Sequence, residues 1–311
     1  MPEIAITTTP IKMSGYRALT EAAAWFRLPG RGLLAVSGED RVRLLNAMLP
    51  GDVRKLSAGE GCYAFSLDAR GRVVSDAGVY VLESEILLDT EPEGTVALRD
   101  HLERHLIADD AEWRALEDAF CAIAVEGPQS EERLRAILAE LPVQPYGVIA
   151  LASGWIARIA STGLAGFRLW IPITDLTLWI ERLSAAGIPP AAPEEARCVR
   201  IENGKPRFGE EITIRFLGPE INLSGTIATG KGCYLGQEVV ERVRSRNLLT
   251  RVLAPITMPE RTRVAAGAKL FDGERRVGEV LSVACSPRNG ALRGIASVAL
   301  PQAVPGVTLQ C

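Results

Sequence analysis

The chain has few of the residues that mark metal and redox sites. It contains two histidines, and its six cysteines form no Cys-X-X-Cys motif. This spacing excludes a zinc ribbon and a thioredoxin-type active site. His101 and His105 are four residues apart in a predicted helix, but no third ligand is evident. We therefore predict no metal site, and we expect both histidines on a partly exposed helix face.

The chain also lacks long apolar runs and an excess of charge of one sign. No segment approaches the ~20 apolar residues that cross a membrane, and no basic stretch followed by an apolar core marks the first residues. We therefore expect a cytoplasmic protein with reduced cysteines and no membrane partner. The net charge of −3 does not favour nucleic-acid binding by bulk electrostatics. Hydrophobic residues make up 47% and charged residues 23%, as in ordinary globular chains.

Short apolar runs interspersed with helical patterns predict an α+β fold with antiparallel sheets. The expected strands are 32–37, 62–67, 73–82, 85–89 and 119–125, and the expected helices are 41–49, 93–106, 130–141 and 176–186. Pro189, Pro190 and Pro193 indicate a rigid connection. After residue 250 the pattern changes to short strands separated by glycine and proline. We therefore predict an α+β module over 1–250 and a small β-barrel over 251–311.

The most informative segment is Lys231-Gly-Cys-Tyr-Leu-Gly-Gln-Glu238, called the octapeptide below. It places two glycines, a cation, a thiol, an amide and a carboxylate within eight residues, which is unusual for a core segment. Residues 237–244 have good helix formers, so the octapeptide is predicted to lead from a loop into a helix. A helix N-terminus and the neighbouring Lys231 would favour the thiolate of Cys233. The alternative is a structural cysteine packed under the loop.

The octapeptide resembles the signature of the YgfZ family of folate-binding proteins, which is related to the glycine-cleavage T-protein, an aminomethyltransferase. Three further segments resemble family stretches: Gly71–Asp76, Ser161–Arg168 and Arg200–Gly209. The resemblance implies a T-protein-like fold, in which two interleaved α+β subdomains surround a central folate-sized cavity beside the C-terminal β-barrel. It implies a protein that binds tetrahydrofolate or a one-carbon derivative and assists maturation or repair of iron–sulfur proteins. Two alternatives stay open, a folate-dependent aminomethyltransferase and a tRNA-modification factor that uses the arginines of 242–251.

The resemblance also implies which residues bind the cofactor. Glu202 would accept two hydrogen bonds from the guanidine-like edge of the pterin, a strong bidentate arrangement. Without the resemblance, Glu202 is a surface residue in an ion pair with Arg200. Lys231 and nearby arginines would bind the anionic tail, and the alternative is a solvated basic face. The residues expected to bind folate are Glu202, Lys231, Gly232, Tyr234, Gln237 and Arg244.

Two residues are candidates for chemistry. Cys233 would serve redox or sulfur chemistry, and any cluster contact would be shared with an iron–sulfur client or assembly protein, because clusters typically need four ligands. Asp76 lies where T-proteins have two successive acidic residues, one of them catalytic, but here Ser75 precedes it. Which of the two positions is the catalytic one stays open. The alternative for Asp76 is a strand-end residue that bonds to the hairpin backbone.

Overall fold

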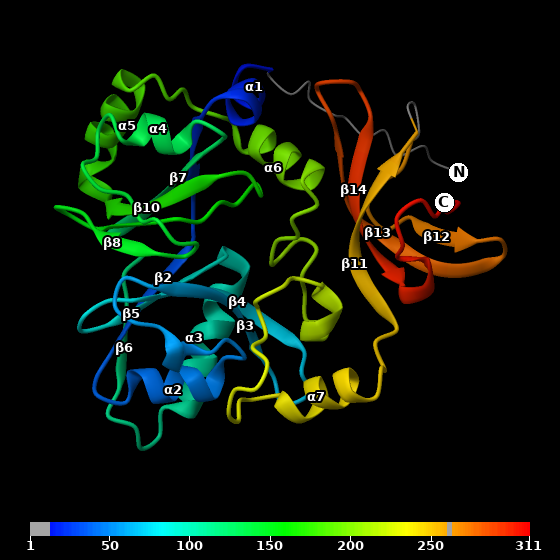
Figure 1. Ribbon diagram of the computed structural model, residues 1–311, viewed down its shortest axis with the longest axis horizontal. Coiled ribbons are helices and arrows are strands. Elements are labelled where there is room, and N and C mark those ends of the chain that lie inside the picture. Colours follow the sequence, from blue (N-terminus) through cyan, green and yellow to red (C-terminus); the bar gives the residue numbers. More distant parts are fainter. Residues whose placement is uncertain (1–12, 260–262) are drawn as a thin grey trace.

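The computed structural model describes residues 13–259 and 263–311 (Figure 1). Its helices are α1 (Met13–Glu21), α2 (Arg41–Met48), α3 (Thr95–His105), α4 (Ser130–Leu134), α5 (Leu176–Ala185), α6 (Pro193–Glu202) and α7 (Gln237–Ser245). Its strands are β1 (Ala24–Leu28), β2 (Gly32–Ser37), β3 (Gly61–Leu67), β4 (Val73–Val81), β5 (Ile86–Thr90), β6 (Glu112–Ala115), β7 (Phe120–Glu126), β8 (Val148–Ala150), β9 (Trp155–Ala157), β10 (Gly166–Pro172), β11 (Arg251–Met258), β12 (Lys269–Asp272), β13 (Arg275–Cys285) and β14 (Leu292–Ala299). Within the described ranges, no helix is long and apolar enough to span a bilayer.

Two five-stranded antiparallel sheets form most of the molecule. The first has the order β1-β7-β10-β9-β8 and the second the order β3-β4-β5-β2-β6. The chain begins in the first sheet with β1, builds the whole second sheet, and returns to the first with β7. The two sheets with their helices are therefore interleaved along the sequence, as the α+β prediction expected.

Strand β4 shows how the two sheets meet. Successive side chains of a strand point to opposite faces. Val79 and Val81 pack with α2 and α3 on one face of the second sheet. Tyr80 lies on the other face and meets Trp170 of the first sheet edge-to-face, with ring centroids 5.0 Å apart. Asp76 has the parity of Tyr80, so the alternation directs this carboxylate toward the first sheet.

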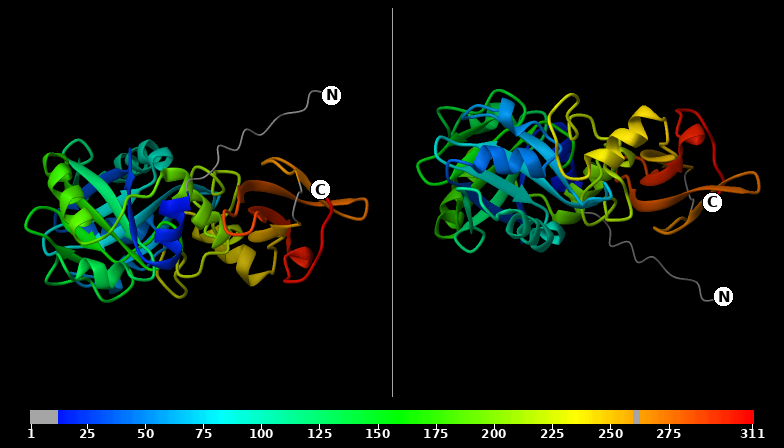
Figure 2. Two further views of the ribbon diagram at one scale, coloured as in Figure 1. Left: turned by 90° about the horizontal axis from the view of Figure 1, so that it is seen from above. Right: turned by 90° about the horizontal axis from the view of Figure 1, so that it is seen from below.

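The predicted C-terminal β-barrel is not confirmed. The described strands after residue 250 form a sheet of order β11-β14-β13-β12, in which the outer strands β11 and β12 are not paired with each other. This sheet lies at one end of the molecule (Figure 2). Leu253 and Ile295 pack against Phe216 of the preceding α+β part. One face of the sheet is therefore buried against the α+β part, and closing the sheet into a barrel is not needed to bury that face. The division at residue 250 stays a prediction.

Helix α6 was not predicted from the sequence. Pro193 is the first residue of this helix, where the fixed φ of proline suits the first turn and no N–H donor is missed. Glu195 stabilises the same end, because its carboxylate accepts the N–H of Ala192 at 2.7 Å and those of Gly15 and Tyr16 at 2.9 and 3.0 Å. Pro193 therefore starts a helix, and the prediction of a rigid connection is wrong for this residue. Pro189 and Pro190 lie in the connection between α5 and α6, where the carbonyl of Pro189 accepts the N–H of Trp25. Helix α4 also ends earlier than predicted, at Leu134.

His101 is buried in α3, with 4% of its surface exposed, and is not on the expected partly exposed face. Burial, together with the charges of His105 and Arg104, lowers its pKa from 6.5 to about 4. His101 is therefore protonated near pH 6.5 in the unfolded chain but only near pH 4 in the folded chain. As the pH falls from 6.5 to 4, this difference lowers the free energy of unfolding.

We expect His101→Leu to lose less stability than the wild type when the pH is lowered from 7 to 5, by about 2 kcal/mol. Urea unfolding of both proteins at the two pH values measures this difference. Asp76 has a raised folded-state pKa, so its effect on the free energy of unfolding has the opposite sign. Asp76 is present in both proteins, and its effect cancels when the two are compared. Equal pH dependence in both proteins would show that His101 is not the group responsible.

Candidate functional site

Asp76 lies on the wall of a central cavity of about 110 Å³. The cavity is bounded by β3 and β4 of the second sheet, by β10 of the first, and by the segments that follow β9 and α6. Asp76 is 2% exposed. The alternative interpretation of Asp76 as a strand-end residue bonded to the hairpin backbone is wrong, because the residue lies inside β4 and lines the cavity.

Three groups hold the Asp76 carboxylate. Tyr63 Oη donates to Oδ2 at 2.9 Å, while Thr90 Oγ1 and the N–H of Glu91 donate to Oδ1 at 3.0 and 3.3 Å. Burial, followed by the charge of Glu91, raises the pKa of Asp76 to about 6. A buried carboxyl group that titrates close to neutral pH is suited to general acid–base catalysis.

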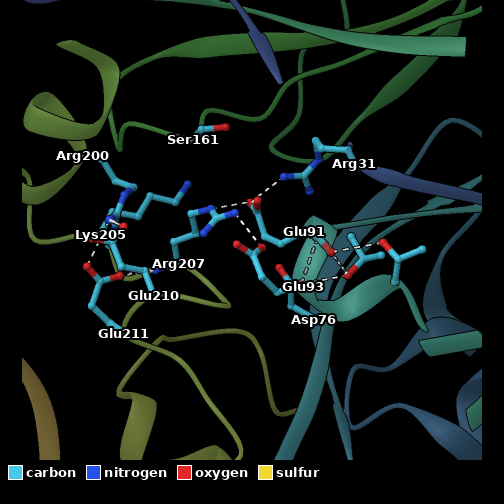
Figure 3. Close-up of polar contacts among 12 residues, drawn as sticks. Arg31, Asp76, Glu91, Glu93, Ser161, Arg200, Lys205, Arg207, Glu210 and Glu211 are labelled. Atoms are coloured by element: carbon cyan, nitrogen blue, oxygen red, sulfur yellow. Dashed lines mark hydrogen bonds and ion pairs between the residues drawn. The ribbon is translucent and has the colours of Figure 1, made fainter. Parts of the chain in front are cut away.

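A row of ion pairs runs along the cavity beside Asp76 (Figure 3). Arg31 binds Glu91, and Arg207 Nε lies 3.0 Å from the same carboxylate. Arg207 Nη2 also lies 2.7 Å from Glu93. Although burial alone would raise the pKa of Glu91, the charges of Arg31 and Arg207 lower it to about 2. Glu91 is therefore a fixed negative charge, in contrast to Asp76 next to it.

Below this row, Asp89 is fully buried between two arginines. Arg31 donates to it from Nε at 2.7 Å and from Nη2 at 3.0 Å, Arg168 binds it through Nη1, and Trp170 Nε1 lies at 3.3 Å. This carboxylate ties the loop before β2 to β10, and so joins the two sheets at the floor of the cavity.

An outer pocket of about 270 Å³ adjoins the central cavity. Both are lined by Arg31, Glu91, Ser161, Arg200 and Arg207. The outer pocket adds apolar residues of β1 and the Arg27 and Arg197 side chains. The ion-pair row of Arg31, Glu91 and Arg207 therefore forms part of the wall of both.

The structure does not bring Glu202 to Asp76. Helix α6 turns about 100° per residue, so Glu202 is about 200° around the helix from Arg200, which lines the central cavity. Glu202 instead lines a separate cavity of about 430 Å³ between α1, α6 and the third sheet. Its carboxylate accepts the Tyr16 hydroxyl at 2.8 and 3.1 Å. The expected ion pair with Arg200 is also wrong, because Arg200 pairs with Glu210 and Glu211.

Lys231 has a structural position. Its ammonium donates to the carbonyls of Asn46, Leu49 and Gly51, at 2.8, 2.6 and 2.6 Å, at the C-terminal end of α2. An ammonium has three N–H donors, so none is left for an anionic tail. Burial lowers its pKa to about 8. Lys231 anchors the octapeptide loop to α2.

The other octapeptide residues also lie outside the central cavity. Tyr234 packs in the core, its ring 5.4 Å from the Lys231 ammonium, and burial raises its pKa to about 12. Cys233 is exposed. Gly232 precedes it in the same loop, and Gln237 is the first residue of α7. Of the described residues that line the cavity, none comes from the octapeptide.

Helix α7 does not present an excess of positive charge. Arg244 pairs with Glu241 at 3.2 Å and Arg242 with Glu238 at 2.6 Å. The expected contact of Arg244 with a folate tail and the contact of this region with tRNA stay predictions, and neither gains support from this surface.

The sequence analysis missed most of the cavity residues. They are Arg31, Tyr63, Glu91, Arg168, Lys205 and Arg207. A signal was present for some of them. Arg168 lies inside the apolar strand β10, and a charge in a strand buried on both faces needs a partner, which is Asp89 of β5. Lys205 and Arg207 lie in the segment Arg200–Gly209, which resembles a family stretch.

Comparisons with known proteins agree with this architecture. The family model described as the GCVT N-terminal domain matches residues 10–231. The aminomethyltransferase of Streptomyces coelicolor is 29% identical over 305 residues, 93% of this chain and 82% of that protein. The aminomethyltransferase of Corynebacterium aurimucosum is 27% identical over 294 residues, 90% of this chain and 79% of that protein.

The crystal structure of the glycine cleavage system aminomethyltransferase T from Bartonella henselae has a similar fold. It matches with a TM-score of 0.81 at 23% identity, covering 95% of this chain and 83% of that chain. The predicted T-protein-like α+β fold is thereby confirmed.

Proposed function

Because the chain belongs to the family of the GCVT N-terminal domain, we propose that it is a folate-dependent transferase of aminomethyl or related one-carbon groups. The observation that carries the proposal is Asp76, a buried carboxyl group with a pKa near 6 on the wall of the central cavity. The aminomethyltransferases to which the chain is similar point to the same class of reaction.

The cavity and the outer pocket fit an elongated folate. Neither alone reaches the ~300–1,000 Å³ typical of drug-sized ligand sites, but the two share five lining residues, and their volumes of about 110 and 270 Å³ together lie within that range. We propose that the ring of the folate lies beside Asp76 in the central cavity. Glu202 and Lys231 take no part in this proposal, since one lines another cavity and the other has no free donor.

Tetrahydrofolate, when bound, supplies a ring nitrogen that can accept a one-carbon unit. Asp76 would hold or release a proton at Oδ2, which receives one hydrogen bond, whereas Oδ1 receives two. Tyr63 orients this oxygen. Glu91 stays ionised, and its repulsion favours the protonated form of Asp76.

The test is an anaerobic transfer assay. The protein is mixed with saturating tetrahydrofolate and a lipoylated carrier protein loaded with an aminomethyl group, and released ammonia and the one-carbon folate are measured. We expect both products in equal amounts. A protein that yields neither product at saturating folate is not an aminomethyltransferase.

A second candidate function has one observation in its favour. Cys233 is exposed at the surface on a loop that Lys231 fixes to α2. A thiol held there, outside the cavity, suits the YgfZ-type role in iron–sulfur protein maturation, in which it would meet a client or assembly protein. If the transfer assay fails, restoration of an inactivated iron–sulfur enzyme by the wild type but not by Cys233→Ser would support this candidate.

A further inference from the structure

Lys205 brings to the central cavity a positive charge that has no carboxylate partner. The residue follows α6 after the turn at Gly204, and its ammonium donates to the carbonyl of Ala160. In the part of the chain that the structure describes, this is its one hydrogen bond, and no carboxylate lies within ion-pair distance. Two of its three donors are therefore free. Burial lowers its pKa, as expected for a cation that lacks a close counter-charge.

Ser161 and Arg168 provide further donors beside this ammonium. Ser161 directly follows the residue whose carbonyl binds Lys205, and its Oγ accepts Arg168 Nη2 at 2.8 Å. The hydroxyl proton of Ser161 is left to donate to another group. Arg168 is 3% exposed, yet its Nε has no hydrogen-bond partner among the described residues. A buried donor left without an acceptor destabilises the protein, and an acidic ligand group would supply the missing acceptor.

The other cations of the cavity do not share this property. Arg200 pairs with Glu210 and Glu211, and Arg207 with Glu91 and Glu93 (Figure 3). Glu126, the fully buried carboxylate of β7, already accepts the N–H groups of Ser161 and Thr162. Among these cations of the cavity, Lys205 is therefore the one without an ion pair in the described part of the chain, and it lies beside Ser161 and the Asp89-paired Arg168.

We propose that Lys205, Ser161 and Arg168 form a carboxylate-binding subsite of the central cavity. The subsite takes the two oxygens of a ligand carboxylate, because charge-assisted hydrogen bonds from an ammonium and a guanidinium suit that group. The identity of the ligand rests on the proposed function, and two sources share this chemistry. One is the glutamate tail of the folate, and the other is a separate small carboxylic acid that brings the one-carbon group to Asp76.

Calorimetric titration of three probes separates the two sources. The probes are tetrahydrofolate, a tetrahydropterin without the glutamate tail, and acetate. The variants are Lys205→Met, which removes the charge, and Lys205→Arg, which keeps it. Arg288→Met is the matched control, because Arg288 lines the separate cavity beside Glu202.

If the tail is the ligand, we expect Lys205→Met to weaken tetrahydrofolate at least tenfold and to leave the tail-free pterin unchanged. If a separate acid is the ligand, we expect the wild type to bind acetate, Lys205→Met to lose it, and tetrahydrofolate to be unaffected. In both cases Lys205→Arg should keep most of the affinity and Arg288→Met all of it. The ligand that Lys205→Met still binds in each case shows that this variant is folded.

Unchanged affinities for both tetrahydrofolate and acetate in Lys205→Met would overturn the subsite. The proposed function fails in a different way. If the wild type binds acetate through Lys205 but binds neither folate nor the tail-free pterin, the carboxylate subsite stands and the folate-dependent function does not.

Discussion

Asp76→Asn should slow one-carbon transfer by about 10²–10⁴-fold, the usual contribution of a general acid or base. Asparagine preserves the shape of the side chain, and its amide oxygen can replace Oδ1, which accepts Thr90 Oγ1 and the N–H of Glu91. Its NH2 group would replace Oδ2 and donate to the Tyr63 hydroxyl, but it cannot exchange a proton with the ligand. The pH profile is the second readout. Because the pKa of Asp76 is raised to about 6, the wild-type rate should change around that pH, and the residual rate of the variant should not.

Two variants serve as controls for this loss. Glu202→Gln alters a carboxylate that lines another cavity, and Cys233→Ser alters an exposed thiol. Both should keep transfer rates within about twofold of the wild type, since neither side chain meets the reacting atoms. A rate for Asp76→Asn within threefold of the wild type would remove Asp76 from the chemistry and leave the cavity a binding site alone.

The position of Asp76 was predictable because it depends on local sequence. Residues 73–82 read as a strand, and the structure has β4 over Val73–Val81. Once the strand and the buried Tyr80 are known, the two-residue period decides which way Asp76 faces. Their spacing of four positions, an even number, fixes this orientation without any knowledge of the rest of the fold.

The position of Glu202 could not be predicted from local sequence alone. Its motif was found, but the face on which it lies depends on helix α6, and the prolines before that helix had been interpreted as a connection. In an extended segment Arg200 and Glu202, two positions apart, would point to the same side. In a helix the same two residues differ by about 200° around the axis. The assignment of Glu202 to the pterin came from the resemblance, and in the structure Glu202 lines the cavity beside α1 instead of the central cavity.

The role of Lys231 in the octapeptide could not be predicted from local sequence either. A lysine between glycines beside a thiol resembles a ligand site, and the sequence contains nothing local that says otherwise. The partners of Lys231 are carbonyls at Asn46, Leu49 and Gly51, about 180 positions earlier in the chain. Backbone carbonyls are present at every residue, so no sequence pattern marks those that will need a donor at the end of a helix.

The largest loss of stability should come from Asp89→Asn. Asp89 is fully buried and neutralises both Arg31 and Arg168, so the change leaves two buried guanidinium groups with too little negative charge. Removing one partner from a buried ion pair typically costs about 3–5 kcal/mol. Urea unfolding at pH 7 should show a loss of this size, because Glu91 is already shared by Arg31 and Arg207 and cannot replace the missing charge.

Glu238→Gln is the matched control, since it makes the same chemical change in an exposed pair with Arg242 on α7. Such a helical surface pair contributes about 0.3–0.5 kcal/mol. A loss below 1 kcal/mol for Asp89→Asn would mean that water reaches the two arginines. A large loss that is recovered when Arg168 is also replaced by methionine would show instead that the cost is the unpaired charge. That outcome has a consequence for function: Asp89 would then hold Arg168 in place on the floor of the cavity, with Nη2 on Ser161 and Nε left free for a ligand.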